Sequence, residues 1–118
     1  MYAQVMERKA ETRTVTIASG DTESAVIDTT GYMFGSFQLP AAFTGSGVTI
    51  HGAMSADGTF KSVPAYDTNA AGTAYGVITA GADDLRFFPA EISAVPFIKI
   101  VSNGTEAADR TITIHLHS

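Results

Sequence analysis

The sequence predicts an all-β fold, an antiparallel β-sandwich with a jelly-roll-like arrangement of about eight strands. Three observations predict it: apolar and polar residues alternate over short runs, turn signals recur every ~8–12 residues, and no segment keeps the spacing of a helix. The chain has 118 residues, of which 45% are apolar, which suffices for one core. We therefore expect an N-terminal arm over residues 1–12 and a single β-sandwich domain over residues 13–118.

The arm carries most of the clustered charge and lacks a clean periodicity. Alternation begins at Arg13, where Val15 and Ile17 fall on one face of the run RTVTIA. The later runs with strand character are, in chain order, SAVIDTT, GYMFGSFQLP, VTIHGAM, FKSVPAYD, YGVITA, LRFF, PFIKIVS and RTITIHLH. The connection ADDLRFFPAEIS has room for one turn of helix at most.

Two of these runs indicate where their strands lie in the fold. In GYMFGSFQLP the aromatic residues occupy both faces, with Tyr32 and Phe34 opposite Phe37, which predicts a central strand or a face in an interface. Gly35 within this run indicates a bulge or a close approach of a neighbouring segment. The run RTITIHLH is the clearest strand, with its apolar residues directed inward and its polar residues outward. The inward residues are Ile112, Ile114 and Leu116, and the outward ones are Thr111, Thr113, His115 and His117.

The stretch MSADGTFKSV lies between two strand-like runs and predicts a hairpin turn at Asp57 and Gly58, because glycine adopts a positive φ without strain. A calcium loop needs several oxygen ligands, and Asp57 is alone in this stretch. A phosphate cradle needs more glycines and a following helix. We expect the turn to return Met54 and Phe60 to the same core.

The acidic balance argues against nucleic acid and anionic membrane surfaces as partners. Twelve acidic and seven basic residues give a net charge of −5, and the basic residues are scattered. Charged residues make up only 16% of the chain, below the ~25% of typical soluble domains, which favours a surface covered by a partner.

The chain has no Cys, so it has no disulfide framework and no Cys-based zinc site. Its first residues lack the apolar region of a secretory signal, and no run reaches the ~18 apolar residues of a membrane span. We expect a protein that stays in a cytoplasm.

Three histidines raise the question of a metal site. His115 and His117 share a face of the last strand, His51 lies elsewhere, and the acids nearest in sequence are Glu106 and Asp109. Polar residues are common at strand ends, so we interpret the pair as solvated or interface histidines and expect no metal ligand set.

We also find no catalytic set and expect that the protein is not an enzyme and binds no cofactor. Asp83 and Asp84 are adjacent acids on a connection, which are usually solvated. The chain has no Trp to serve as a sugar platform and no Gly-x-Ser-x-Gly elbow. Asn103 begins an Asn-Gly-Thr sequon that we interpret as coincidence.

One series of features points to a family. The stretch GYMFGSFQLPAAFTGSGVTIHGAMSADGTFKSV, followed by PFIKIVSNGT and ADRTITIHL, resembles the head decoration, or cement, proteins and related virion proteins of tailed bacteriophages. These are small β-sandwich proteins encoded beside the major capsid protein. The resemblance runs from about Val15 to Leu116 and rests on turns and strand starts. The chain departs from the pattern at His51 and Gly52.

The resemblance implies a structural virion protein that sits on the outside of a phage capsid, meets the major capsid protein, and stabilises the shell as a homotrimer that bridges capsomers. It would reside in the host cytoplasm during assembly and on the virion afterwards. The arm would reach a neighbour through Tyr2, Val5, Met6 and Arg8. The alternative is a carbohydrate- or receptor-binding module of a phage tail or fibre, with stacking faces from Tyr66, Tyr75 and Phe43.

Overall fold

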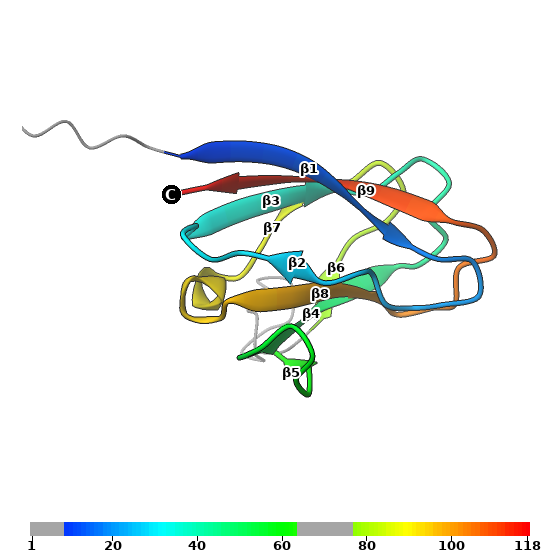
Figure 1. Cartoon of the computed structure of the whole chain (residues 1–118). Helices are drawn as coiled ribbons and strands as arrows, with labels where there is room; N and C mark the ends of the chain where they lie inside the picture. The colour runs from blue at the N-terminus through cyan, green and yellow to red at the C-terminus, as the bar shows by residue number, and fades with distance from the viewer. Residues whose placement is uncertain (1–8, 64–76) are drawn as a thin grey trace, which may run out of the picture.

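A computed structural model of the chain describes residues 9–63 and 77–118. Over these residues the protein is all-β: nine strands form two antiparallel sheets packed face to face, with one short 3-10 helix and no α-helix (Figure 1). The strands are β1 (Ala10–Ile17), β2 (Ile27–Asp28), β3 (Phe34–Gln38), β4 (Gly47–Ala53), β5 (Lys61–Ser62), β6 (Val77–Thr79), β7 (Leu85–Phe87), β8 (Phe97–Ser102) and β9 (Arg110–His117). The predicted antiparallel β-sandwich is confirmed.

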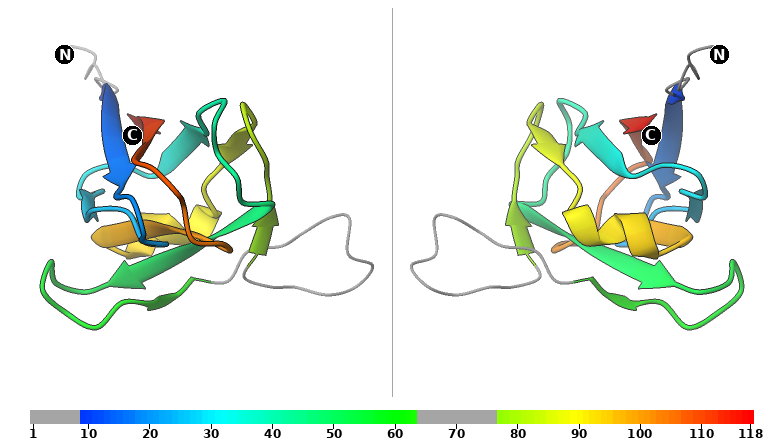
Figure 2. Two further views of the ribbon diagram at one scale, coloured as in Figure 1. Left: turned by 90° about the vertical axis from the view of Figure 1, so that its right-hand side faces the viewer. Right: turned by 90° about the vertical axis from the view of Figure 1, so that its left-hand side faces the viewer.

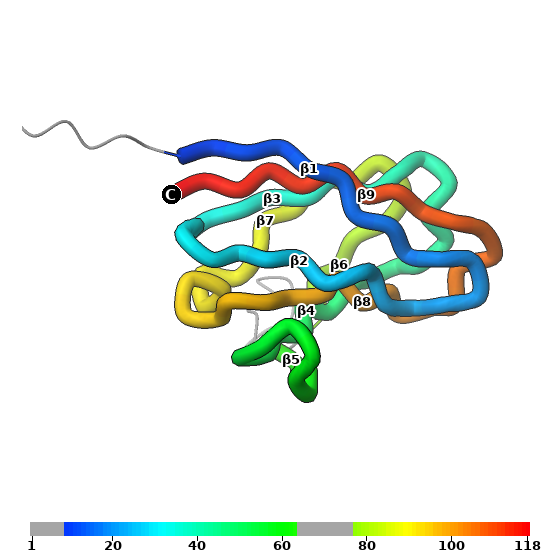
Figure 3. Tube along the Cα trace, in the orientation of Figure 1, coloured from blue at the N-terminus to red at the C-terminus, as the bar shows by residue number. Residues whose placement is uncertain are grey.

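The strand order is that of a jelly roll. The first sheet has the order β1-β9-β3-β7, and in the second β2-β8-β4 is joined by β5 and β6, which both pair with β4. Strands from the two halves of the chain therefore pair from the outside inward, β1 with β9, β2 with β8, β3 with β7 and β4 with β6. A long hairpin rolled up in this way gives the two-sheet jelly roll. The tube trace shows the two ends of the hairpin, β1 and β9, side by side (Figure 3).

The strand β1 starts earlier than predicted. It begins at Ala10, which lies opposite His117 of β9, and not at Arg13. Residues 10–12, assigned to the arm by sequence, therefore belong to the sheet. The alternation fails there because the first residues of β1 lie beyond the apolar core: Glu11, on the inward side, pairs with Arg13 and accepts a hydrogen bond from the hydroxyl of Tyr32 at 2.6 Å.

Alternation builds the core between the sheets, as the sequence predicts. In β9 the inward Ile112, Ile114 and Leu116 are fully buried, and in β8 Ile98 and Ile100 lie opposite them in the second sheet. Each fully buried aliphatic side chain stabilises the fold by about 1.5–3 kcal/mol relative to an exposed one. With no disulfide in the chain, this burial and the strand pairing hold the domain together.

The strand β3 lies inside its sheet, between β9 and β7, so the expected central strand is confirmed. Tyr32, expected on the face of Phe34, instead precedes the strand and packs against the core. Phe37 is buried and packs against Phe88 with ring centroids 5.1 Å apart, whereas Phe34 faces outward. Gly35 permits the close approach of Phe88, because a Cβ built on Gly35 would lie 2.6 Å from Phe88 Cδ2.

The predicted turn in MSADGTFKSV lies between β4 and β5, but its geometry differs from the prediction. The amide of Gly58 donates to the carbonyl of Ser55 at 3.1 Å, so the turn spans 55–58, and Gly58 does not adopt a positive φ. Met54 does not return to the core: β4 ends at Ala53, and Met54 is 79% exposed at the start of the turn. Phe60 is half-buried under the ammonium of Lys99, 4.6 Å from the ring centroid.

The helical turn expected in ADDLRFFPAEIS is the 3-10 helix η1 (Ala90–Ala94), which begins after Pro89 and buries Ile92. Viewed along the sandwich, η1 covers one end of the space between the sheets, below β3 and β7 (Figure 2). Within residues 9–63 and 77–118, no helix has the length and apolar character needed to cross a membrane.

Candidate functional site

The outer surface of the first sheet is the main candidate site. The strand register places its outward residues in continuous rows, such as Phe87, Ser36, His115 and Thr12 from β7 to β1. We call this surface the uncharged face, because none of its residues is Lys, Arg, Asp or Glu. Its residues are Ala10, Thr12, Thr14 and Thr16 of β1, Thr111, Thr113, His115 and His117 of β9, Phe34, Ser36 and Gln38 of β3, and Leu85 and Phe87 of β7.

The uncharged face has an apolar side and a hydroxyl-rich side. Phe34 and Phe87 are 57% and 73% exposed on β3 and the edge strand β7, and Leu85 lies beside them. The hydroxyl-rich side consists of threonines from β1 and β9. The outer surface of the second sheet differs, because it carries Asp28 and an ion pair between Lys99 and Glu23 at 3.3 Å. A surface without charged residues and with exposed aromatic side chains is typical of a protein interface.

The histidines do not come together as a metal site in the part of the chain that the structure describes. His115 and His117 lie side by side with ring centroids 6.3 Å apart, and His115 Nδ1 is 3.0 Å from the hydroxyl of Thr12. His51 lies on β4 in the other sheet. No group of three or more His, Cys, Asp or Glu side chains suited to a metal ion occurs among the described residues.

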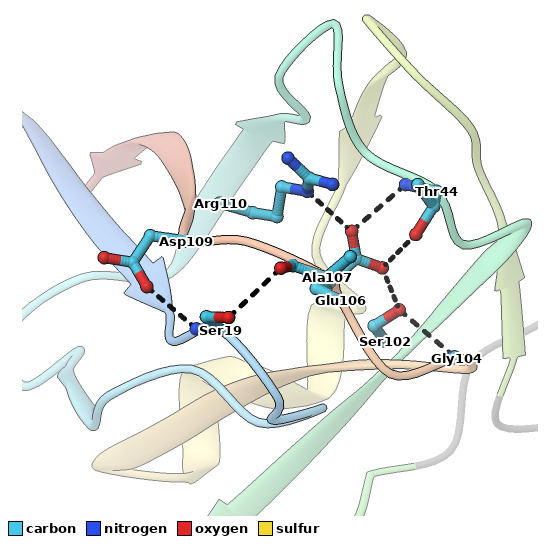
Figure 4. A network of polar contacts seen from close by, with 8 residues as sticks. All are labelled: Ser19, Thr44, Ser102, Gly104, Glu106, Ala107, Asp109 and Arg110. Atoms are coloured by element: carbon cyan, nitrogen blue, oxygen red, sulfur yellow. Dashed lines mark hydrogen bonds and ion pairs between the residues drawn. The ribbon is translucent and has the colours of Figure 1, made fainter.

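The polar cluster at one end of the sandwich centres on Glu106, whose side chain has no exposed surface. Its two carboxylate oxygens accept four hydrogen bonds (Figure 4). The amide and hydroxyl of Thr44 donate at 3.1 and 3.0 Å, Arg110 Nε at 2.9 Å and the hydroxyl of Ser102 at 3.3 Å. Burial raises the pKa of Glu106, but these hydrogen bonds outweigh it and hold the pKa below its usual value of 4.5.

The loop between β8 and β9, which carries Glu106, is also held by the turn after β1. The amide of Gly20 donates to the carbonyl of Glu106 at 2.8 Å, and the amide of Ser19 donates to the carboxylate of Asp109 at 2.8 Å. The network therefore joins three loops, those after β1, β3 and β8. Both oxygens of the Glu106 carboxylate are used within the protein, so this carboxylate locks the three loops together and is not free to bind a ligand.

The adjacent acids have different surroundings. Asp83 is exposed and adopts a φ of 64°, whereas the carboxylate of Asp84 accepts hydrogen bonds from the amide of Gly81 at 2.7 Å and from Arg86 at 3.2 Å. Asp84 thus shapes the turn before β7. Asn103 also has a structural role, since its side chain makes two hydrogen bonds to Ser46.

The aromatic residues proposed for sugar stacking are not assembled by the described part of the structure. Phe43 is 4% exposed and belongs to the core, so its assignment as a stacking face is wrong; it was placed in a loop, but the loop turns it inward. Tyr66 and Tyr75 lie outside the described residues, as do the arm residues Tyr2, Val5, Met6 and Arg8.

Sequence reasoning missed the Glu106 cluster, and it missed that Leu85 and Phe87 join Phe34 in one apolar group on the uncharged face. A single Glu in the loop NGTEAAD carries no periodic signal, although Arg110 four residues later is a weak one. The outward position of His115 and His117 follows from alternation in β9. Their neighbours Phe34 and Phe87 follow only from the strand register.

The comparisons with known proteins support the fold. No protein-family model matches the chain. No curated protein sequence matches it. The crystal structure of the SPBc2 prophage-derived protein YomS is similar, with a TM-score of 0.69 over 99% of this chain and 100% of that chain, at 8% sequence identity. At this identity the similarity shows a common fold.

Proposed function

We propose that this chain is a structural virion protein that binds the outside of a phage capsid and stabilises it. The observation that carries the proposal is that the jelly roll matches a prophage-derived protein from end to end, in agreement with the resemblance of the sequence to phage head decoration proteins. The Glu106 carboxylate, whose oxygens are all bonded within the protein, and the uncharged face suit a protein that works by packing against others. The proposal requires no catalytic residue and no cofactor.

The mechanism is mass action. A protein that binds the assembled shell and not its separated subunits stabilises the shell at each site by RT ln(1 + [L]/Kd), about 2.7 kcal/mol when its concentration is 100 times Kd. The partner is the major capsid protein, and a homotrimer that bridges neighbouring capsomers adds avidity. The protein would be located on the virion surface, after a period in the host cytoplasm.

The proposal is tested by co-sedimentation of the purified chain with phage heads stripped of their external proteins and with intact, already decorated heads. We expect saturable binding to stripped heads, little binding to intact heads, and a higher melting temperature of the loaded shells. A chain that ignores stripped heads contradicts the proposal.

The role proposed for the arm is tested with a shorter chain. Deletion of residues 1–8 removes Tyr2, Val5, Met6 and Arg8 but leaves β1, which starts at Ala10. We expect weaker binding to heads or loss of trimers, with the melting temperature of the free domain unchanged. Unchanged occupancy on stripped heads contradicts a role for the arm.

A further inference from the structure

A groove open to solvent lies between the β4–β5 hairpin and η1, at one end of the second sheet (Figure 2). It has a volume of about 530 Å³, within the range of about 300–1,000 Å³ that is usual for ligand pockets. We call it the hairpin groove. The residues that decide its chemistry are Met54, Val63, Ala94 and Val95 on its walls and Lys61 and Glu91 beside them. None of them belongs to the uncharged face or to the Glu106 cluster.

The walls of the hairpin groove are apolar and are shaped by the packing of the fold. Val63 is buried, and Val95, which follows η1, packs against the core. Gly52 lets the hairpin and η1 meet, because a Cβ at this position would lie 2.6 Å from Val95 Cγ1 and 3.0 Å from Val63 Cγ2. Met54 is 79% exposed and has a flexible side chain that can adapt to an occupant. The groove therefore offers apolar surface that an incoming side chain can cover without a rearrangement of the fold.

Two opposite charges flank these apolar walls. Lys61 is on β5 and Glu91 is in the first turn of η1, and both side chains are exposed. Among the described residues neither takes part in an ion pair, whereas four other basic side chains of this part of the chain each have an acidic partner. Both charges are therefore free to pair with a ligand that carries the complementary charges.

We infer that the hairpin groove binds an extended peptide segment of another protein. A large apolar side chain of the segment lies between the walls, with an acidic residue at Lys61 and a basic residue at Glu91. In an extended segment the residues two positions before and after this anchor point to the same side as the anchor, so they face the groove with it. A nucleic acid would be repelled by Glu91 and by the net charge of −5, and an apolar small molecule would leave both charges unused. Charge complementarity therefore favours a peptide.

Under the proposed function the segment belongs to the major capsid protein, and this part of the inference rests on that proposal. The groove would then supply a contact that recognises a particular sequence of the shell, which the uncharged face alone does not. The binding of a peptide to the groove can be measured without any shell, so the two proposals can be tested separately.

Selection from a random library of short peptides on the full chain tests the inference. We expect an enriched motif in which a large apolar residue lies between an acidic and a basic residue. Ala94→Trp fills the groove and should weaken the binding of a selected peptide by about tenfold or more, measured by fluorescence polarisation. The matched control is Ala108→Trp, which places the same side chain on the exposed loop before β9 and should leave the binding unchanged.

Charge reversal at Lys61 is the second variant, because it changes the charge beside the groove and leaves the walls as they are. Lys61→Glu should weaken the same peptide about two- to fivefold, as expected for the loss of an exposed ion pair. It should also select a basic residue where the unchanged chain selects an acidic one. Lys9→Glu is the control and should keep the original motif, because Lys9 also has no ion pair among the described residues but does not line the groove.

Two results would overturn the inference: a library that yields no such motif, or a selected peptide that binds Ala94→Trp and Lys61→Glu as well as it binds the unchanged chain. Circular dichroism confirms that the variants are folded. Co-sedimentation with stripped heads separates this inference from the proposed function. If Ala94→Trp binds heads as well as the unchanged chain does, the proposed function stands and the capsid protein is not the source of the segment. If the chain selects the motif but ignores heads, the groove binds a peptide of another protein and the proposed function is wrong.

Discussion

The carboxylate of Glu106 and the guanidinium of Arg110 form an ion pair of 2.9 Å in which the Glu106 side chain has no exposed surface. Arg110 is the first residue of β9, which lies between β1 and β3 in the first sheet. The pair therefore fixes the end of the loop that leads into β9. Of the other two donor residues, Ser102 ends β8 four residues before Glu106, and Thr44 reaches it from the loop after β3, 62 residues away. The pair is therefore a point at which the two sheets are held in one arrangement.

Glu106→Gln should destabilise the domain strongly. The Gln side chain keeps the shape of Glu but removes the negative charge that pairs with Arg110. Its NH₂ group is a donor, and it takes the place of an oxygen that accepts hydrogen bonds from the hydroxyls of Thr44 and Ser102. Breaking a buried pair from one side costs about 3–5 kcal/mol, which we expect as a lower urea midpoint with an unchanged slope. Glu23→Gln is the control, because its pair with Lys99 is exposed and contributes about 0–1 kcal/mol. Equal decreases of the urea midpoint in the two variants would contradict a stabilising role of the buried Glu106 carboxylate.

The Glu106 cluster should also make the free energy of unfolding depend on pH in the acidic range. The pKa of Glu106 is lowered in the folded state, so its stabilisation is complete above its unfolded value of about 4.5 and is lost as the pH falls through the lower folded value. The difference in unfolding free energy between the unchanged chain and Glu106→Gln should therefore shrink below pH 4.5. Glu11 and Asp28, whose pKa values are also lowered, are present in both chains and cancel in the difference. A difference that stays constant from about pH 7 to about pH 2 would contradict this assignment.

Gly35→Ala should disturb the packing of the first sheet on the core. The added methyl group would lie 2.6 Å from Phe88 Cδ2 and 3.0 Å from Leu116 Cδ2, in a region without free space. Overpacking of this kind costs about 1–3 kcal/mol, measured as a lower melting temperature and urea midpoint. Gly104→Ala is the matched control, because a methyl group there meets nothing within 4 Å and the residue has no positive φ. We expect it to be neutral or slightly stabilising, and equal stability of the two variants would exclude the close approach.

Much of the fold could be predicted from the sequence because the apolar residues of the strands alternate. The buried and exposed positions of β9 follow from Ile112, Ile114 and Leu116 alone. The start of β1 at Ala10 could not be predicted, because strand pairing there relies on backbone hydrogen bonds and on the polar contacts of Glu11, which leave no apolar pattern. The turn at Asp57 and Gly58 was predicted with a positive φ at Gly58. The actual turn spans 55–58 and places Gly58 at a position that needs no positive φ.

The candidate sites were harder to predict because they depend on register and on distant contacts. Alternation places His115 on the outside of β9, but only the pairing of Ser36 with both His115 and Phe87 shows that an aromatic ring lies on the same row. The burial of Glu106 depends on Thr44 reaching it from another loop. A residue whose surroundings come from across the fold leaves no signal in its own neighbourhood of the sequence.

Zinc or nickel should not raise the melting temperature of the protein by several degrees. Any ligand that binds only the folded state stabilises it by mass action, so a built metal site would show a clear increase in excess metal. Among the described residues, His115 and His117 have no third ligand beside them, and His115 Nδ1 already contacts the hydroxyl of Thr12. Thermal denaturation with and without metal checks this, with a variant carrying both His115→Gln and His117→Gln as the control. An increase of several degrees that disappears in this variant would establish a metal site on the uncharged face.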